Sequence, residues 1–136
     1  MNRKLENFRK AFHNLHDIYD YSEPYSNIEL AGIVSLFEIC FELSWKAIKE
    51  ALELSGVPEG KTGSPKLIIK SAYQAGMIDD EDLWLEVLSA RNNVAHAYNQ
   101  DIALDIARNT KDQFYSMFEK LLLEFELEEN WFINKN

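Results

Sequence analysis

Apolar residues recur at helical spacing along most of the chain, and the strict alternation that is typical of strands is scarce. The first amphipathic segment ends before Pro24, because the residue before a proline is disfavoured in the helical region. Its apolar stripe consists of Leu5, Phe8, Phe12, Leu15 and Tyr19. A long helix is predicted next, over residues 26–55. Ser26 and Glu29 have the spacing of a capping box at its start, and Gly56 ends it.

The second half of the chain predicts three further helices. Residues 57–63 are predicted to form a short glycine-rich connection. Ser64-Pro65 is a helix start, a cap followed by a first-turn proline, and Gly76 is the corresponding stop. Asp79 is expected to cap the next helix and Asp101 the last long one.

Four substantial helices and a shorter one predict an all-α fold, an up-and-down four-helix bundle with an additional short helix. The length of 136 residues predicts a single domain, residues 1–136, with an acidic and frayed end over residues 126–136. Hydrophobic residues make up 46% of the chain, enough for a substantial core. Long helices that pack in pairs leave one face uncovered, so a homodimer is expected.

Charge and composition narrow the function. A net charge of −9 argues against non-specific binding of nucleic acid, which requires Lys and Arg to neutralise phosphates. Five basic residues lie apart from the acidic tail, and the sequence leaves open whether they converge on a local basic cleft: Lys66, Lys70, Arg91, Arg108 and Lys111. The single cysteine, Cys40, lies on an apolar helix, which predicts a buried, inert thiol in a reducing compartment. The polar start and the lack of a long apolar run predict a cytoplasmic protein without membrane contact.

The candidate chemistry lies in the run Arg91-Asn92-Asn93-Val94-Ala95-His96-Ala97-Tyr98. A guanidinium binds phosphate through a planar fork of donors, and an unperturbed imidazole titrates near neutral pH. On a regular helix Arg91 and His96 lie about 140° apart, so their side chains would not meet. Either the helix breaks near Asn92 and Asn93, or a second subunit supplies the partner group. We favour the second subunit, because a two-fold axis can bring two copies of the motif into one cleft.

The sequence gives little support to metal chemistry. His13 and His16 lie three residues apart on the first predicted helix, with Asp17 and Asp20 nearby. No carboxylate or cysteine joins the two histidines at a convincing ligand spacing. We therefore expect no metal site and no cofactor.

Several other stretches accompany the Arg-x4-His-x-Tyr run along the chain. They are Phe-Glu-Ile-Cys-Phe-Glu-Leu-Ser-Trp-Lys at residues 37–46, Ser64-Pro65, and residues 75–80 and 83–85. In this order, the motifs resemble those of the HEPN superfamily (higher eukaryote and prokaryote nucleotide-binding). Within it, the chain is most similar to the branch called nucleotidyltransferase substrate-binding proteins, and the resemblance extends from about Leu5 to Leu122.

The resemblance implies a toxin that cleaves RNA without a metal and is neutralised by a minimal nucleotidyltransferase. His96 would then be the general base, Arg91 would hold the phosphate, and Asn92 would orient the substrate or the imidazole. Tyr98 would contact the substrate, and it matches the tyrosine that the partner enzyme modifies with AMP in related HEPN toxins. Glu42, on a helix that faces the cleft in the family, would orient Arg91.

Two other interpretations stay open. In the first, a non-catalytic dimer cleft presents a nucleotide or an acceptor group to the nucleotidyltransferase, with Arg91 as phosphate anchor and His96 as hydrogen-bond donor. In the second, the chain is a structural dimer without a ligand. There His96 would cap helix-end carbonyls, and Arg91 would form a surface pair with Glu86 or Asp101. Ala97 replaces a threonine that is often found at this place in the family, and this departure favours neither the ribonuclease nor the binding module.

Overall fold

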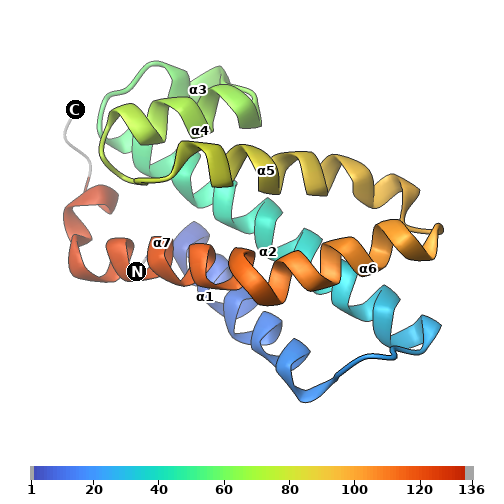
Figure 1. Ribbon diagram of the computed structural model, residues 1–136. Coiled ribbons are helices and arrows are strands. Elements are labelled where there is room, and N and C mark those ends of the chain that lie inside the picture. The colour runs from blue at the N-terminus through green and yellow to red at the C-terminus, as the bar shows by residue number, and fades with distance from the viewer. Residues whose placement is uncertain (1, 134–136) are drawn as a thin grey trace.

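The computed structural model describes residues 2–133, and every regular element in that part of the chain is helical (Figure 1). The α-helices are α1 (Arg3–Leu15), α2 (Asn27–Leu54), α3 (Glu59–Thr62), α4 (Pro65–Gln74), α5 (Glu81–Asn92), α6 (Gln100–Asn109) and α7 (Tyr115–Leu127). Short 3-10 segments follow three of them (His16–Asp20, Asn93–His96 and Glu129–Phe132), and a π-helical turn (Thr110–Phe114) joins α6 to α7. The predicted all-α bundle is confirmed.

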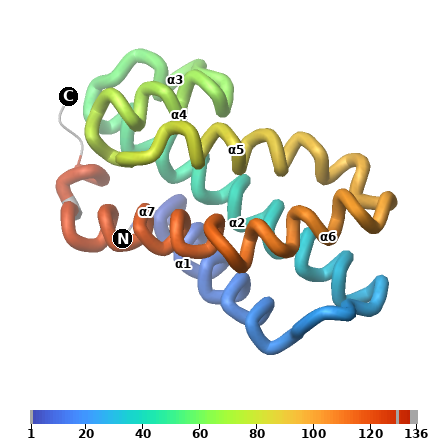
Figure 2. Tube along the Cα trace, in the orientation of Figure 1, coloured from blue at the N-terminus to red at the C-terminus, as the bar shows by residue number. Residues whose placement is uncertain are grey.

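Helix α2 is the central element of the bundle. It packs against α1, α3, α4, α5 and α6, and Figure 2 shows it crossing behind the consecutive helices α6 and α7. Its inner face is fully buried at Phe37, Phe41, Ile48 and Leu52. Phe37 stacks on Phe114, with the ring centroids 5.6 Å apart. Each large apolar side chain buried in this way contributes about 1.5–3 kcal/mol.

Local signals in the sequence set both ends of α2. The Ser26 hydroxyl accepts a hydrogen bond from the Glu29 backbone N–H at 3.1 Å, and the Glu29 carboxylate accepts one from the Ser26 backbone N–H at 2.9 Å. Gly56 follows the C-terminus with a φ of 82°, which favours glycine. Gly76 ends α4 in the same way, with a φ of 77°. The predicted capping box and both glycine stops are confirmed.

Two predicted helix caps are wrong by one or two residues. Asp80, not Asp79, caps α5 by accepting from the Leu83 backbone N–H at 3.0 Å. Asp79 instead forms an ion pair with Lys120 of α7, at 2.6 Å. The cap of α6 is Asn99 rather than Asp101, because the Asn99 side chain accepts from two backbone N–H groups of the first turn. In both places several side chains of capping type stand close together, and the packing selects one.

The chain turns back on the bundle after α7. The indole N–H of Trp131 donates to Glu124 at 2.8 Å, and Phe132 lies edge-on to Phe125 with ring centroids 4.9 Å apart. The end expected to be frayed is therefore packed in this part. Residues 134–136, which complete that end, lie outside the described residues.

The connection predicted at residues 57–63 contains the one-turn helix α3, which lies close against α2. A Cβ added at Gly60 would lie 2.4 Å from the Glu53 backbone nitrogen. We expect Gly60→Ala to lower the free energy of unfolding by about 1–3 kcal/mol, because α3 must move away from α2. Urea unfolding followed by circular dichroism measures the effect. Lys61→Ala, at the exposed neighbouring position, is expected to stay within about 0.5 kcal/mol of the wild type. Equal stability of all three proteins would contradict this packing.

Candidate functional site

Arg91 lies in the last turn of α5 and reaches across to α2. Its Nε donates to Glu42 Oε1 at 2.5 Å, and one terminal nitrogen donates to Asn92 Oδ1 at 3.2 Å. The guanidinium carbon lies 5.8 Å from the centroid of the buried Phe41 ring. The remaining oxygen of Glu42 accepts from the indole N–H of Trp45 at 3.0 Å. Arg91 is thus held in one orientation from three sides, with its side chain 28% exposed.

The partner of Arg91 differs from those of the surface pair considered for this residue. Arg91 pairs with Glu42, 49 residues away along the chain, and not with Glu86 or Asp101. Glu86 accepts from Gln113 instead, at 3.3 Å. The Glu42–Arg91 contact that the family resemblance implies is therefore formed.

The helix that carries Arg91 ends before His96. Helix α5 stops at Asn92, and a 3-10 segment carries the chain to His96, so the break that we considered less favoured is present. The spacing of a regular helix therefore no longer argues for a second subunit. Within residues 2–133, however, no hydrogen bond or ion pair joins Arg91 to His96. His96 is exposed, and its ring lies edge-on to Tyr98 with centroids 6.5 Å apart. Asn92, proposed to orient the substrate or the imidazole, contacts Arg91.

Tyr98 stands at the rim of a groove between α2 and the motif. The groove has a volume of about 490 Å³, and Ala31, Ser35, Val94 and Ala97 contribute to its lining. Tyr98 is 87% exposed, which makes it one of the most accessible large side chains of the described part of the protein. Its phenol is therefore open to another protein.

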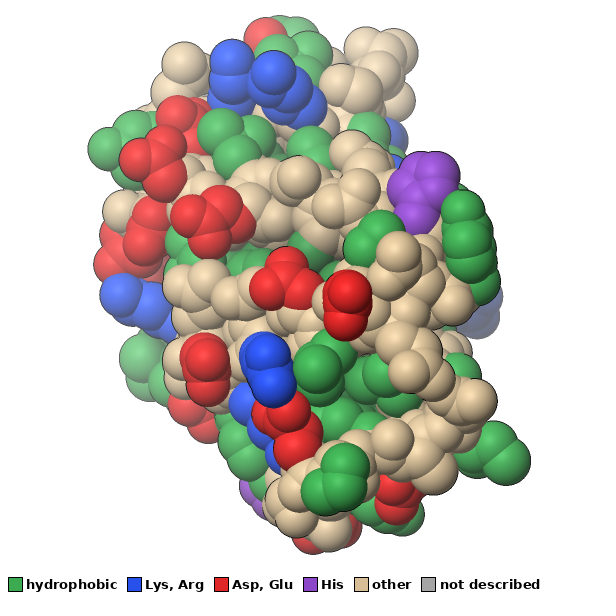
Figure 3. Space-filling view, turned by 45° about the vertical axis from the view of Figure 1, so that its right-hand side comes forward, with side chains coloured by type: hydrophobic (Ala, Val, Ile, Leu, Met, Phe, Trp, Pro, Cys, Tyr) green, Lys and Arg blue, Asp and Glu red, His purple; other side chains and the backbone are tan. Residues whose placement is uncertain are grey.

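The five basic residues do not form one common cleft. Arg108 forms a two-point pair with Glu23, at 3.1 and 2.6 Å, and these bonds hold the pKa of the Glu23 carboxyl below its usual value. Lys111 bonds the Tyr21 carbonyl and lies 5.2 Å from the centroid of the Tyr25 ring. The others are Lys66 and Lys70, exposed on α4, and Arg91, bound to Glu42. Figure 3 shows more of the surface carrying acidic than basic side chains on the face that it draws.

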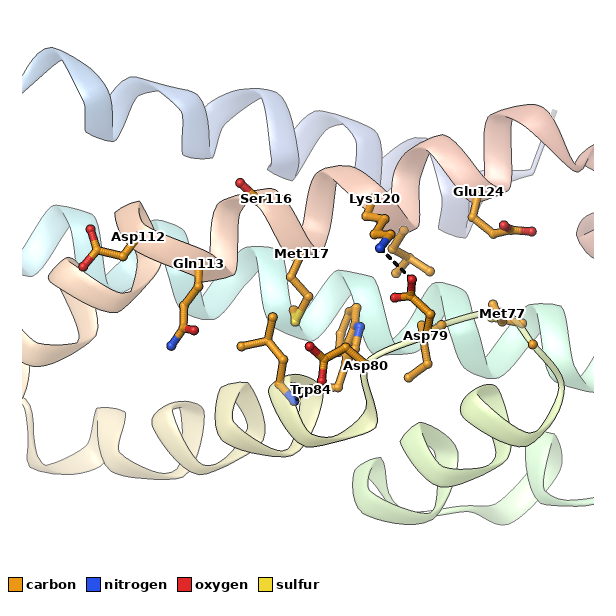
Figure 4. Close-up of a pocket in the computed structure, with 14 residues that line it drawn as sticks. Met77, Asp79, Asp80, Trp84, Asp112, Gln113, Ser116, Met117, Lys120 and Glu124 are labelled. Atoms are coloured by element: carbon orange, nitrogen blue, oxygen red, sulfur yellow. Dashed lines mark hydrogen bonds and ion pairs between the residues drawn. The ribbon is translucent and has the colours of Figure 1, made fainter.

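A second groove lies between α7, α5 and the loop before α5 (Figure 4). It has a volume of about 380 Å³ and is acidic, with Asp79, Asp80, Asp112 and Glu124 in its lining. The Asp79–Lys120 ion pair joins its two sides. No residue of the Arg91 motif lines this groove, and its charge does not suit an anionic substrate.

Other reactive side chains are accounted for by packing. Burial raises the pKa of the Cys40 thiol well above its ordinary value, which confirms the predicted buried, inert cysteine. The His16 ring lies between Tyr19 and Tyr115, with centroid distances of 5.8 and 5.9 Å. In the part of the chain that the structure describes, no cluster of three or more His, Cys, Asp or Glu side chains could hold a metal ion. None of the helices there has the length and apolar character needed to cross a lipid bilayer.

Sequence reasoning found Arg91 and Glu42 but missed Trp45 as part of the site. The available signal was the spacing of Glu42 and Trp45, which lie three residues apart and therefore share one face of α2. We used Trp45 only as part of the stretch 37–46 that carries the family resemblance, and gave it no role in the site. The structure shows it half-buried, with its N–H on Glu42.

Comparison with known proteins identifies the family to which this chain is similar. The model of a family described as "Nucleotidyltransferase substrate binding protein like" matches residues 3–127. The chain is similar to the Haemophilus influenzae protein named "Probable ribonuclease HepT", with 29% identity over 85 residues. That match covers 61% of this chain and 58% of the relative, which is less than two thirds of the relative's length.

Solved structures share the fold. HI0074 from Haemophilus influenzae, described as having the fold of a substrate binding domain of a nucleotidyltransferase, has a TM-score of 0.76 at 24% identity. The alignment covers 90% of this chain and 98% of HI0074. A protein from Thermus thermophilus has a TM-score of 0.72 at 30% identity, over 85% of this chain and 95% of that one.

Proposed function

Because the chain belongs to the family of nucleotidyltransferase substrate-binding proteins within the HEPN group, we propose that it is a toxin that cleaves RNA without a metal and is neutralised by a partner nucleotidyltransferase. One observation carries the proposal. Arg91, the arginine of the Arg-x4-His motif, is already oriented by Glu42. His96, the histidine of the same motif, is exposed to solvent five residues further along the chain. The proposed activity is the one given in the name of the Haemophilus influenzae relative, "Probable ribonuclease HepT".

The proposed reaction is an internal transesterification of RNA. His96 takes the proton of a ribose 2′-hydroxyl, and that oxygen attacks the adjacent phosphorus. The bond from phosphorus to the 5′-oxygen of the next nucleotide breaks, leaving a cyclic phosphate and a 5′-hydroxyl. The leaving oxygen receives a proton from His96 of the partner subunit. No step requires a metal ion.

Arg91 has donors left for the phosphate. A guanidinium carries five N–H groups, and two of those of Arg91 are used by Glu42 and Asn92. The other three lie on its two terminal nitrogens, which match two oxygens of one phosphate. They would strengthen their bonds as negative charge builds up in the transition state. In this proposal Asn92 orients Arg91.

The proposed homodimer uses the outer face of α2. Ile28 is 86% exposed and Ile39 47% exposed on this helix. Between them a Cβ on Gly32 would meet no atom within 4 Å. Grooves of about 490 and 290 Å³ border the same stretch, so a helix of a second copy can pack beside it. Because Tyr98 lines the larger groove, a copy docked there would lie next to the motif.

This interface predicts that Gly32→Phe yields a folded monomer. The ring would meet no atom of its own chain near the Cβ, but it would stand where the second copy approaches. Sedimentation velocity at micromolar concentration is expected to show a dimer for the wild type and a monomer for Gly32→Phe, with unchanged helical circular dichroism. Ser116→Phe, exposed on α7, is the matched control and should stay dimeric. A wild-type monomer would contradict the homodimer, and a dimeric Gly32→Phe would contradict this interface.

The second candidate function is a non-catalytic module that presents a nucleotide or an acceptor group to the nucleotidyltransferase. The Glu42–Arg91 pair favours it in one respect, since the carboxylate offsets the positive charge that would attract RNA. Incubating the purified chain with transfer RNA and EDTA separates the two functions. Cleavage that depends on Arg91 and His96 supports the ribonuclease. Intact RNA together with tight binding to a co-expressed nucleotidyltransferase supports the module.

A further inference from the structure

We propose that Trp45 is a positioning residue of the site, which acts on Arg91 through Glu42. The indole N–H of Trp45 fixes one carboxylate oxygen, and the other oxygen fixes Arg91 Nε. We call these two hydrogen bonds, from Trp45 to Glu42 and from Arg91 to Glu42, the relay. The effect of the relay on catalysis rests on the proposed ribonuclease function. The relay itself is a property of the folded chain and can be tested without any substrate.

The geometry gives each group one role. Glu42 and Trp45 are three apart on α2, so their side chains leave the helix on the same side. The Nε1–Oε2 distance is 3.0 Å and the Nε–Oε1 distance is 2.5 Å. A carboxylate with a different donor on each oxygen cannot rotate without losing one of the two bonds. Trp45 therefore restricts the orientation of Glu42, and Glu42 restricts that of Arg91.

The relay decides which edge of Arg91 is open to a ligand. With Nε on Glu42 and the guanidinium carbon 5.8 Å from the Phe41 ring centroid, the donors that remain lie on the terminal nitrogens. An arginine ordered before the substrate arrives loses less conformational freedom when it binds the phosphate. Without the indole bond, Glu42 and Arg91 would keep their ion pair but sample other rotamers, and the phosphate would meet a less ordered donor edge.

Packing alone is the competing explanation for Trp45, since its ring contacts the hydrophobic core. Trp45→Phe separates the two roles, because it keeps an aromatic ring and removes only the N–H donor and part of the ring. Trp131→Phe is a closely matched control. The Trp131 indole N–H also donates to a glutamate, Glu124 at 2.8 Å, but away from Arg91.

The first experiment follows the Arg91 Nε–H by ¹⁵N NMR of the intact chain, with the signal assigned by its loss in Arg91→Lys. We expect a resolved signal with slow solvent exchange in the wild type and in Trp131→Phe. Exchange should become about 10-fold faster in Trp45→Phe, the scale of one lost hydrogen bond to a charged group. If Trp45→Phe does not fold, Glu42→Gln takes its place, because this variant weakens the ion pair directly and should also make exchange faster. Exchange as slow as in the wild type, in whichever of the two variants is measured, overturns the relay.

The second experiment measures RNA cleavage in the same variants. Trp45→Phe is expected to lower kcat/KM about 10-fold. Its effect should nearly vanish in a Glu42→Gln background, because residues in one network are not additive. Full additivity of the two substitutions overturns the relay. If the wild type cleaves no RNA, the proposed function fails, and the exchange measurement still decides on the relay.

Discussion

Replacing His96 with alanine is expected to slow RNA cleavage by about 10²- to 10⁴-fold, the usual contribution of a general base. Arg91→Ala should cost about 10²- to 10³-fold, because the phosphate loses its charged donors in the transition state. Neither change should disturb the fold, since His96 is exposed and Arg91 lies at the end of α5. Initial rates on transfer RNA in the presence of EDTA, resolved on denaturing gels, measure both effects.

Matched controls guard this experiment against a contaminating nuclease. His13→Ala removes an exposed histidine of α1, and Arg3→Ala removes an exposed arginine of the same helix. Both should cleave like the wild type. A contaminant would make all preparations equally active, and a metal-dependent reaction would stop with EDTA. Either result would contradict the metal-independent mechanism that uses Arg91 and His96.

The local parts of this structure could be predicted from the sequence because their causes lie within a few residues. The Ser26–Glu29 capping box and the glycine at position 56 need only their own turn of chain. Asp79 and Asp80 show the limit of such reasoning. Either carboxylate could cap α5, and Lys120, some forty residues away, pairs with one of them.

Most members of the site could be predicted, with Trp45 missed, and the Glu42–Arg91 contact was expected only from the family resemblance. The motif marks Arg91 and His96, whereas the Glu42–Arg91 bond depends on how α2 and α5 cross in the folded bundle. The helix break was visible as two consecutive asparagines after Arg91, and we gave it too little weight. For the basic residues, the sequence left open a common cleft that the structure does not form. Glu23 binds Arg108, and the Tyr21 carbonyl binds Lys111, away from Arg91.

Incubation with the partner nucleotidyltransferase and ATP is expected to modify Tyr98 and to silence the ribonuclease. The Tyr98 phenol oxygen would attack the α-phosphorus of ATP, with loss of its proton and release of pyrophosphate. Its side chain is 87% exposed, so the enzyme can reach it without unfolding the chain. The new phosphodiester carries a negative charge, and the His96 ring lies only 6.5 Å from the Tyr98 ring. RNA would therefore be repelled from the imidazole that must contact it.

Mass spectrometry should find one adenylyl group on the peptide that contains Tyr98, and cleavage should fall to the level of His96→Ala. Tyr98→Phe keeps the ring but lacks the attacking oxygen, so this variant should cleave RNA and resist neutralisation. Tyr73→Phe is the control, because Tyr73 is exposed on α4, outside the motif, and its loss should leave modification and silencing intact. An unmodified Tyr98 peptide would remove Tyr98 as the target. A modified peptide with undiminished cleavage would mean that the phenol does not border the path of the RNA, and silencing would then have to come from the bound nucleotidyltransferase.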